Sequence, residues 1–158
     1  MDEAVLIAIR ELLTTRKVLC LAAIIDGEPA ASLLPYAVAS DMQSAYVQAS
    51  RLAKHSRALD EGATVSLLIH GLDTDDVDPL QVPRLTVQAV VEPLERGTDA
   101  FDAASRVFTA RLPTAELTLG LADFTLYRLR FGRGRLVSGF AQAYDLRPDT
   151  FQELARLE

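Results

Sequence analysis

The 158-residue chain has no tryptophan, one cysteine, two histidines and two lysines. A single cysteine, Cys20, excludes an intramolecular disulfide and a cysteine-rich metal site; it lies in an apolar run, where a buried thiol is expected. Metal-site spacing of histidines, cysteines and acids is missing as well. The sequence places no catalytic partner beside His55 or His70, so a Ser-His-Asp triad is not indicated.

Long apolar runs and excess positive charge are also lacking. No run reaches the roughly 18–20 apolar residues of a membrane span, and the start lacks the basic region and cleavage site of a signal peptide. We therefore expect a cytoplasmic protein without a membrane partner. The net charge of −6 argues against nucleic-acid binding. Hydrophobic residues make up 49% and aromatic ones 6%, so the core of what we expect to be a single domain over residues 1–158 is mainly aliphatic.

Hydrophobic periodicity and turn residues predict a mainly β protein with peripheral helices. The predicted strands cover residues 17–25, 28–38, 45–50, 63–70, 84–94, 123–131 and 136–140. The predicted helices cover residues 3–14, 51–61, 99–110 and 115–121, with a short one opening at Pro148. Asp26-Gly27 is typical of a type I′ hairpin, and Gly132 and Gly134 predict a turn between the last two strands. Hairpin spacing favours an α+β barrel of six to seven mostly antiparallel strands, whose closure would hide the sheet edges.

A basic segment runs from Ser50 to Arg57, where a predicted strand passes into a predicted helix, and it contains no acid. Unpaired first-turn amides and the helix dipole favour an anion at such a junction. Ser50 and Lys54 are four residues apart, as are Arg51 and His55, so each pair can share a helical face. A hydroxyl, backbone donors and cations suit a phosphate. The same pattern also suits solvated charges behind an N-cap serine.

The order of several short motifs is more specific than any one of them. They are the apolar strand at 18–24, Asp26-Gly27, ASLLPY at 31–36, YVQAS at 46–50, HSRAL at 55–59 and ATVSLL at 63–68. This order resembles the pyridoxamine 5′-phosphate oxidase-like FMN-binding split-barrel superfamily. The later motifs are more similar to its haem-utilisation (HugZ-like) branch: DPL at 78–80, RLTV at 84–87, DFTLY at 123–127 and SGFAQA at 138–143.

The resemblance implies FMN at the interface of a homodimer. Its phosphate would be bound by Ser50, Arg51, Lys54 and His55, with Arg51 and Lys54 as the main charge partners. The flavin ring would lie near Ser32, Leu33, Pro35 and Tyr36, with Arg84 close by. Two residues depart from the family pattern, because His55 stands where many members carry a phosphate-binding lysine and Ala58 where many carry asparagine.

Several candidate ligand-binding residues could instead have an ordinary structural role. Tyr36 could stack on a ring or pack in the core, and Arg84 could bind a ligand or be solvated at the start of its strand. His70 is expected at the surface. A second basic cluster either lines the mouth of a ligand site or forms a solvated hairpin, with Arg128 and Arg130 on one strand face; its members are Arg128, Arg130, Arg133 and Arg135.

Three functions follow as hypotheses. The first is an FMN-binding oxidoreductase of unknown small-molecule substrate, in which the flavin supplies the redox chemistry; no residue is indicated as a catalytic acid or base. The second is a haem-binding or haem-degrading split-barrel protein, which needs cations for the propionates and an axial ligand. Haem-handling relatives tend to carry an additional C-terminal stretch with histidine. This sequence lacks such a stretch, which counts against the haem hypothesis. The third is a cofactor-free dimeric binding protein of the same fold.

Overall fold

The computed structural model describes residues 1–139 and 141–157. Seven strands lie in this part of the chain: β1 (Val18–Ile25), β2 (Glu28–Val38), β3 (Ser44–Ser50), β4 (Thr64–His70), β5 (Arg84–Leu94), β6 (Phe124–Gly139) and β7 (Gln142–Leu146). The helices are α1 (Glu3–Thr15), α2 (Asp99–Arg111), α3 (Ala115–Leu119) and α4 (Pro148–Leu154), with 3₁₀ helices η1 (Lys54–Ala58) and η2 (Pro79–Gln81). None of these helices is both long enough and apolar enough to cross a membrane.

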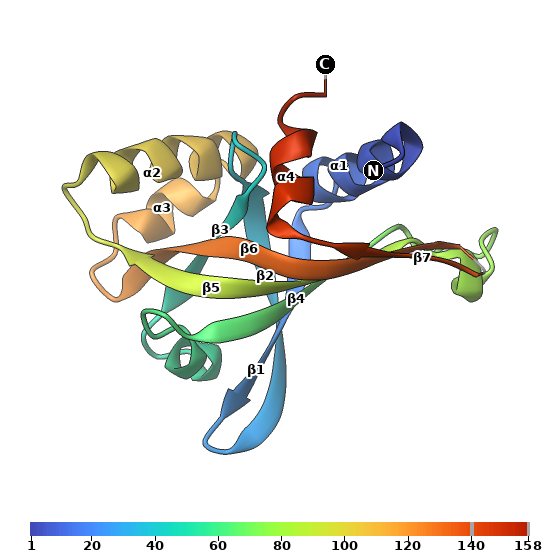
Figure 1. Cartoon of the computed structure of the whole chain (residues 1–158). Coiled ribbons are helices and arrows are strands. Elements are labelled where there is room, and N and C mark those ends of the chain that lie inside the picture. Colours follow the sequence, from blue (N-terminus) through green and yellow to red (C-terminus); the bar gives the residue numbers. More distant parts are fainter. Residues whose placement is uncertain (140, 158) are drawn as a thin grey trace.

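The strands form a closed antiparallel barrel with one additional strand. Their order is β3-β2-β1-β4-β5-β6-β7, and a further pairing between β3 and β6 closes the first six into a ring. Strand β7 pairs with the far half of β6 and extends the sheet outside the barrel (Figure 1). The predicted mainly β barrel of six to seven antiparallel strands is confirmed, and closure removes the sheet edges that an open sheet would expose.

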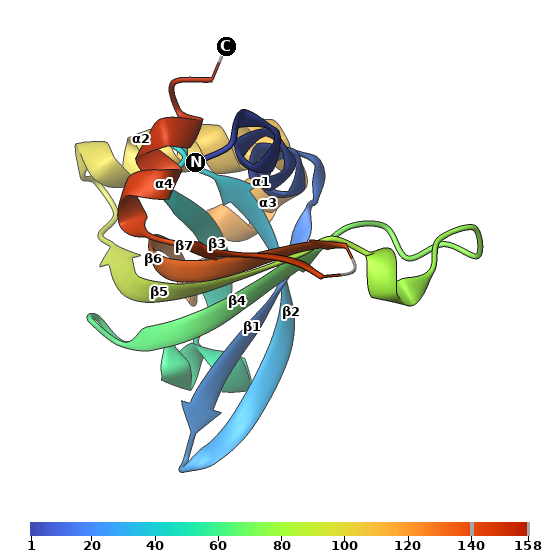
Figure 2. The same ribbon diagram turned by 45° about the vertical axis from the view of Figure 1, so that its right-hand side comes forward.

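The hairpin between β1 and β2 extends away from the rest of the barrel, toward the bottom of Figure 2. Its turn has positive φ at both central residues, 54° at Asp26 and 81° at Gly27, and Ile25 pairs with Glu28. Positive φ at both positions defines the type I′ turn, so the Asp26-Gly27 prediction is confirmed. This turn matches the twist of two antiparallel strands and sets their register.

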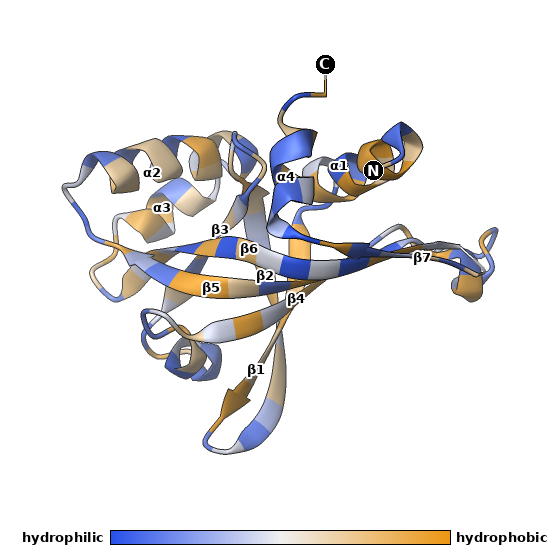
Figure 3. Cartoon of the chain, viewed as in Figure 1, coloured by the Kyte–Doolittle hydropathy of each residue, from blue (hydrophilic) through white to orange (hydrophobic). Residues whose placement is uncertain are grey.

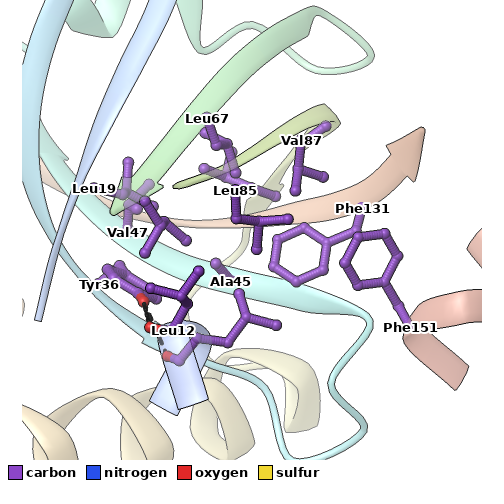
Figure 4. Close-up of a cluster of buried hydrophobic side chains, with 14 of the residues drawn as sticks. Leu12, Leu19, Tyr36, Ala45, Val47, Leu67, Leu85, Val87, Phe131 and Phe151 are labelled. Atoms are coloured by element: carbon purple, nitrogen blue, oxygen red, sulfur yellow. Dashed lines mark hydrogen bonds between the residues drawn. The ribbon is translucent and has the colours of Figure 1, made fainter. Parts of the chain in front are cut away.

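The barrel interior is filled mainly by aliphatic side chains, as predicted. Helices α1 and α4 pack against one another and cover one end of this core. Tyr36 lies inside, with its ring fully buried and its hydroxyl donating to the carbonyl of Leu13 at 2.9 Å (Figure 4). Phe131 and Phe151 meet nearby with ring centroids 5.0 Å apart. The tyrosine hydroxyl therefore ties β2 to the C-terminal end of α1, as a buried polar group requires.

A second apolar cluster lies outside the barrel, where α2 and α3 cover the outer face of neighbouring strands. Phe108 of α2 is 1% exposed and packs in the same cluster as Tyr46 of β3 and Leu126 of β6. Ala37, on the C-terminal half of β2, is buried beneath these helices too. This part of the barrel wall is therefore apolar on both sides.

The outer face of β1, β4 and the first half of β2 has no such cover from residues 1–139 and 141–157. Leu33 is 69% exposed and Ile24 66% exposed, and Leu68 is exposed as well. The register places these side chains together, because Cys20 pairs with both Leu33 and Leu68. Figure 3 shows the end of β1 as a strongly hydrophobic segment. We call this surface the bare face, defined by Val18, Cys20, Ala22, Ile24, Ala31, Leu33, Pro35 and Leu68.

The predicted helix over residues 51–61 is wrong. The chain forms only the short 3₁₀ helix η1, from Lys54 to Ala58. The backbone N–H of Arg51 donates to the carbonyl of Asp123 at 2.8 Å, so the pairing of β3 with β6 runs one residue past Ser50. Leu52 then points into solvent, and the segment offers little apolar surface for a longer helix to bury. Helices this short depend on such packing.

The predicted turn at Gly132 and Gly134 is also wrong, because β6 continues through both glycines to Gly139. The register between β5 and β6 shifts between Val87 and Ala89, which marks a bulge at this point. A Cβ at Gly134 would lie 2.7 Å from the carbonyl oxygen of Thr86. The glycines therefore permit close strand approach rather than a reversal. The strand predicted over 136–140 is the end of β6, and its residue 140 lies outside the described part of the chain.

Candidate functional site

The predicted phosphate site begins at Ser50, the last residue of β3. Its hydroxyl donates to the Asp123 carboxylate at 2.8 Å and accepts from the N–H of Leu52 at 3.2 Å. With the Arg51 N–H bonded to the Asp123 carbonyl, both amides that follow Ser50 already have partners. An anion bound here would also meet the negative charge of Asp123, which lowers the affinity expected of the site.

The cations of this junction differ in exposure. Arg51 and Lys54 are exposed, and the Arg51 guanidinium lies 3.5 Å from the Ala122 carbonyl. His55 is partly buried, and its Nε2 finds no hydrogen-bond partner among the described residues. Burial lowers the pKa of His55 below its usual 6.5. The lowered pKa favours the neutral imidazole, so His55 offers a phosphate less positive charge than Arg51 or Lys54.

The four predicted ring contacts on β2 fall on two faces of the strand. Ser32 and Tyr36 alternate with Leu33 and Pro35, as β geometry requires. Ser32 pairs with the buried Leu21 and points inward like Tyr36, whereas Leu33 and Pro35 point outward and are exposed. Tyr36 was predicted either to stack on a ligand ring or to pack in the core. The structure shows the second, because its side chain is fully buried. Only Leu33 and Pro35 are available to an external ligand.

Arg84 lies far from the junction within one chain. It opens β5, is exposed, and pairs with Val137 near the end of β6, whereas Ser50 pairs with Phe124 at the start of β6. At about 3.3 Å per residue, roughly 40 Å of extended strand separates the two positions. Arg84 instead pairs with His70 across β4 and β5, next to the bare face.

A cavity of about 320 Å³ lies between the junction and helices α2 and α3. Its wall is mostly apolar and contains Pro35, Gln48, Phe108, Leu112, Thr114, Ala115, Thr118 and Phe124. The Thr118 hydroxyl donates to the Gln48 Oε1 at 3.0 Å. The Gln48 Nε2 is buried without a partner in residues 1–139 and 141–157. This cavity lies beside Pro35 of the predicted ring site, and its lining suits a small, mainly apolar group.

The second basic cluster lies further along β6. Arg128 and Arg130 share a face of β6, as predicted, and both line a cavity of about 410 Å³. Arg128 lies 5.7 Å from the centroid of the Tyr46 ring and 3.4 Å from Glu92, and the Nε of Arg130 lies 3.8 Å from the same carboxylate. Glu92 and the lining residue Asp41 balance these two positive charges, so the cavity has little preference for an anion.

Two residues of interest carried no signal in the sequence. Asp123 reaches Ser50 only because β6 pairs with β3, across 73 residues of chain. His70 was expected to be a surface residue, which it is, but its pairing with Arg84 depends on the β4–β5 register. No group of three or more histidines, cysteines or acids in the described ranges could hold a metal ion.

The closed six-strand barrel, with helices on one side of its wall and a bare face on the other, defines a split-barrel protein. The chain is 30% identical to the heme oxygenase HutZ of Vibrio cholerae over 154 residues, which cover 95% of this chain and 85% of HutZ. It therefore belongs to the haem-utilisation branch of the pyridoxamine 5′-phosphate oxidase-like split-barrel superfamily. No family model matches the sequence.

Solved structures agree with this fold. A heme binding protein from Mycobacterium smegmatis superposes with a TM-score of 0.85 at 23% identity, covering 97% of this chain. This chain spans only 62% of that protein. The structure of HutZ, a heme storage protein from V. cholerae, gives a TM-score of 0.73 at 26% identity over 89% of this chain and 98% of HutZ. A pyridoxinephosphate oxidase family protein from Clostridium acetobutylicum gives 0.69 at 15% identity over 96% and 99% of the two chains.

Proposed function

We propose that this protein binds haem. The observation that carries the proposal is the 30% identity to a heme oxygenase along nearly the whole chain. Two of the similar structures are described as heme binding or heme storage proteins. FMN, the first hypothesis from the sequence, has support only from the superfamily. The haem alternative therefore becomes the main interpretation.

The bare face has the chemistry that a haem needs. Haem is a flat apolar ring that carries two carboxylates, so it favours an apolar surface with cations at one edge. Leu33 on β2 and Leu68 on β4 provide exposed apolar surface on the two strands that flank β1, and Arg84 lies at the edge of that surface on β5. When bound, haem supplies redox-active iron, and the residues of this chain orient it and neutralise its propionates.

The junction at Ser50 is less suited to the phosphate of FMN. A phosphate needs free donors, but Asp123 accepts the hydrogen bonds of the Ser50 hydroxyl and the Arg51 amide. The missing helix over 51–61 also removes the dipole that was expected to favour an anion. FMN at Ser50, Arg51, Lys54 and His55 remains a prediction, and it requires that Asp123 give up these two hydrogen bonds.

We also propose that the protein is a homodimer formed through the bare face. A monomer that leaves Ile24, Leu33 and Leu68 in water exposes a contiguous apolar patch of the kind that marks an interface. Within one chain, Arg84 and the Ser50 junction lie at opposite ends of β6. A second copy could bring its own junction to the first copy's Arg84, and the ligand would then contact both chains.

The decisive experiment compares haem and flavin on the same purified protein. Haem is added stepwise and the Soret band is followed, while FMN and riboflavin are titrated separately by quenching of their fluorescence. We expect a saturating Soret change at one haem per chain and weak flavin binding with little preference for FMN. Tight FMN binding with no haem saturation would overturn the proposal and restore the first hypothesis from the sequence.

A further inference from the structure

We propose that His70 is the axial ligand through which this chain binds the haem iron. The inference rests on the proposed haem binding and adds the residue that bonds to the metal. It is carried by three observations: the hydrogen bond of one ring nitrogen, the position of His70 beside the bare face, and the lower exposure of His55, Met42 and Cys20.

The hydrogen bond of the His70 ring favours a tautomer that leaves Nε2 free to bind a metal. Its Nδ1 lies 2.7 Å from the carbonyl oxygen of Gly71. A carbonyl oxygen only accepts, so Nδ1 carries the proton and donates it. The lone pair is then on Nε2, at the far side of the ring. Metal-binding histidines typically show this arrangement, with one nitrogen donating to a backbone carbonyl and the other free for the metal.

The surroundings of His70 match the rest of a haem. Leu68 precedes it by two residues on β4, so both side chains point to the outer face of the sheet and both are exposed. Arg84 is its directly paired neighbour on β5. An iron on the His70 Nε2 would thus have apolar surface toward Leu68 and Leu33 and a guanidinium on the adjacent strand, where a propionate would find it.

Three other side chains that could bind haem iron, those of His55, Met42 and Cys20, are less exposed than that of His70. The Nε2 of His55 is buried, and Met42 is buried in the barrel core. Cys20 lies on the bare face between Leu33 and Leu68, but it is only partly exposed. Cys20 is therefore the competitor that an experiment has to separate from His70.

The test uses the full chain and its absorption and electron paramagnetic resonance spectra, with no need for turnover. Wild-type protein with haem is expected to show the spectrum of histidine-ligated iron. His70→Ala is expected to lose that signature and to bind haem at least about tenfold more weakly. Because the side chain is exposed, the variant should fold normally, which circular dichroism checks. Adding imidazole, which fills the vacated position, should restore the wild-type spectrum.

Two matched variants complete the design. His55→Ala and Cys20→Ser should both keep the wild-type haem spectrum. The inference is overturned if His70→Ala keeps it too, or if the signature disappears in Cys20→Ser, which would assign the iron to the thiolate. These outcomes are distinct from failure of the proposed function, in which wild-type protein itself would give no saturable Soret change.

Discussion

The outer face of strand β2 has two halves, and helices pack over only one of them. Toward its C-terminal end, Ala37 is buried beneath α2 and packs with Phe108. Toward its N-terminal end, Leu33 is 69% exposed and no helix lies over it. Both halves carry apolar residues on the outer face, so composition does not distinguish them. The halves differ only in which later segment of the chain folds back onto them.

The comparison separates intramolecular packing from surface that is available to a partner. Where α2 and α3 cover the wall, apolar outer residues contribute to the stability of one chain. Where nothing covers it, the same kind of residue gives one chain little stability and is instead available to a second copy or to a flat ligand. Changes in the covered half should therefore affect unfolding, and changes on the bare face should affect association and binding.

The largest effect is expected from Phe108→Ala, in the covered half. Removing this fully buried ring should lower the free energy of unfolding by about 3–5 kcal/mol, because transfer and cavity costs add. Urea denaturation measures the change. Leu33→Ala is the matched control, and its cost in the dissociated chain should stay within about 0.5 kcal/mol. Equal costs for both variants would contradict the division between the two halves.

The second prediction is that a charge on the bare face weakens the dimer. Leu33→Asp should raise the dimer dissociation constant by at least about tenfold, because an unpaired carboxylate would be buried in the contact. Analytical ultracentrifugation measures it. Leu117→Asp on α3, where the leucine is 81% exposed and outside the bare face, should leave the dimer intact. A wild-type protein that is monomeric at micromolar concentration would rule out this interface.

An effect of similar size is expected at the edge of the bare face, on haem affinity rather than on association. Arg84→Ala should weaken haem binding by roughly ten- to a hundredfold, the loss expected for a charge-assisted hydrogen bond of about 1.5–3 kcal/mol. The Soret titration measures the haem affinity of both proteins. Higher salt should reduce the difference in affinity between the wild type and the variant, because salt screens the charge of Arg84. Arg133→Ala, an exposed arginine on β6, is the control. An unchanged affinity in Arg84→Ala would place the propionates elsewhere.

The smallest effect concerns pH and His55, at the end of the barrel near the junction. Burial lowers the pKa of His55 in the folded chain below the 6.5 of the unfolded chain. On acidification the unfolded state therefore binds the proton first, so this contribution to stability is present above about pH 6.5 and is lost as the pH falls below it. Urea denaturation between pH 5 and 7 should show a shallower pH dependence of the unfolding free energy for His55→Gln than for the wild type. An unchanged pH dependence would contradict the lowered pKa of His55.

Strand bounds followed well from local patterns. Strands 28–38 and 84–94 agree with β2 and β5, because the first begins after Asp26-Gly27 and the second after Pro83. Local patterns failed where the decisive contact is distant. Spacing at 50–57 permits a helix, but the backbone bond from Arg51 to Asp123 keeps the chain extended. Gly132 and Gly134 suggest a turn in isolation, yet they serve a close approach to β5.

The sequence by itself determined the kinds of elements, the antiparallel barrel and its aliphatic core, since these depend on periodicity and turn residues a few positions apart. Only the tertiary structure decided which half of β2 is covered, that Asp123 meets Ser50, and that Arg84 lies beside His70 rather than beside the junction. Each of these depends on strand pairing or helix packing between segments that are distant in sequence. A side chain's neighbours across a sheet depend on register, and a shift of one residue would turn every side chain to the other face.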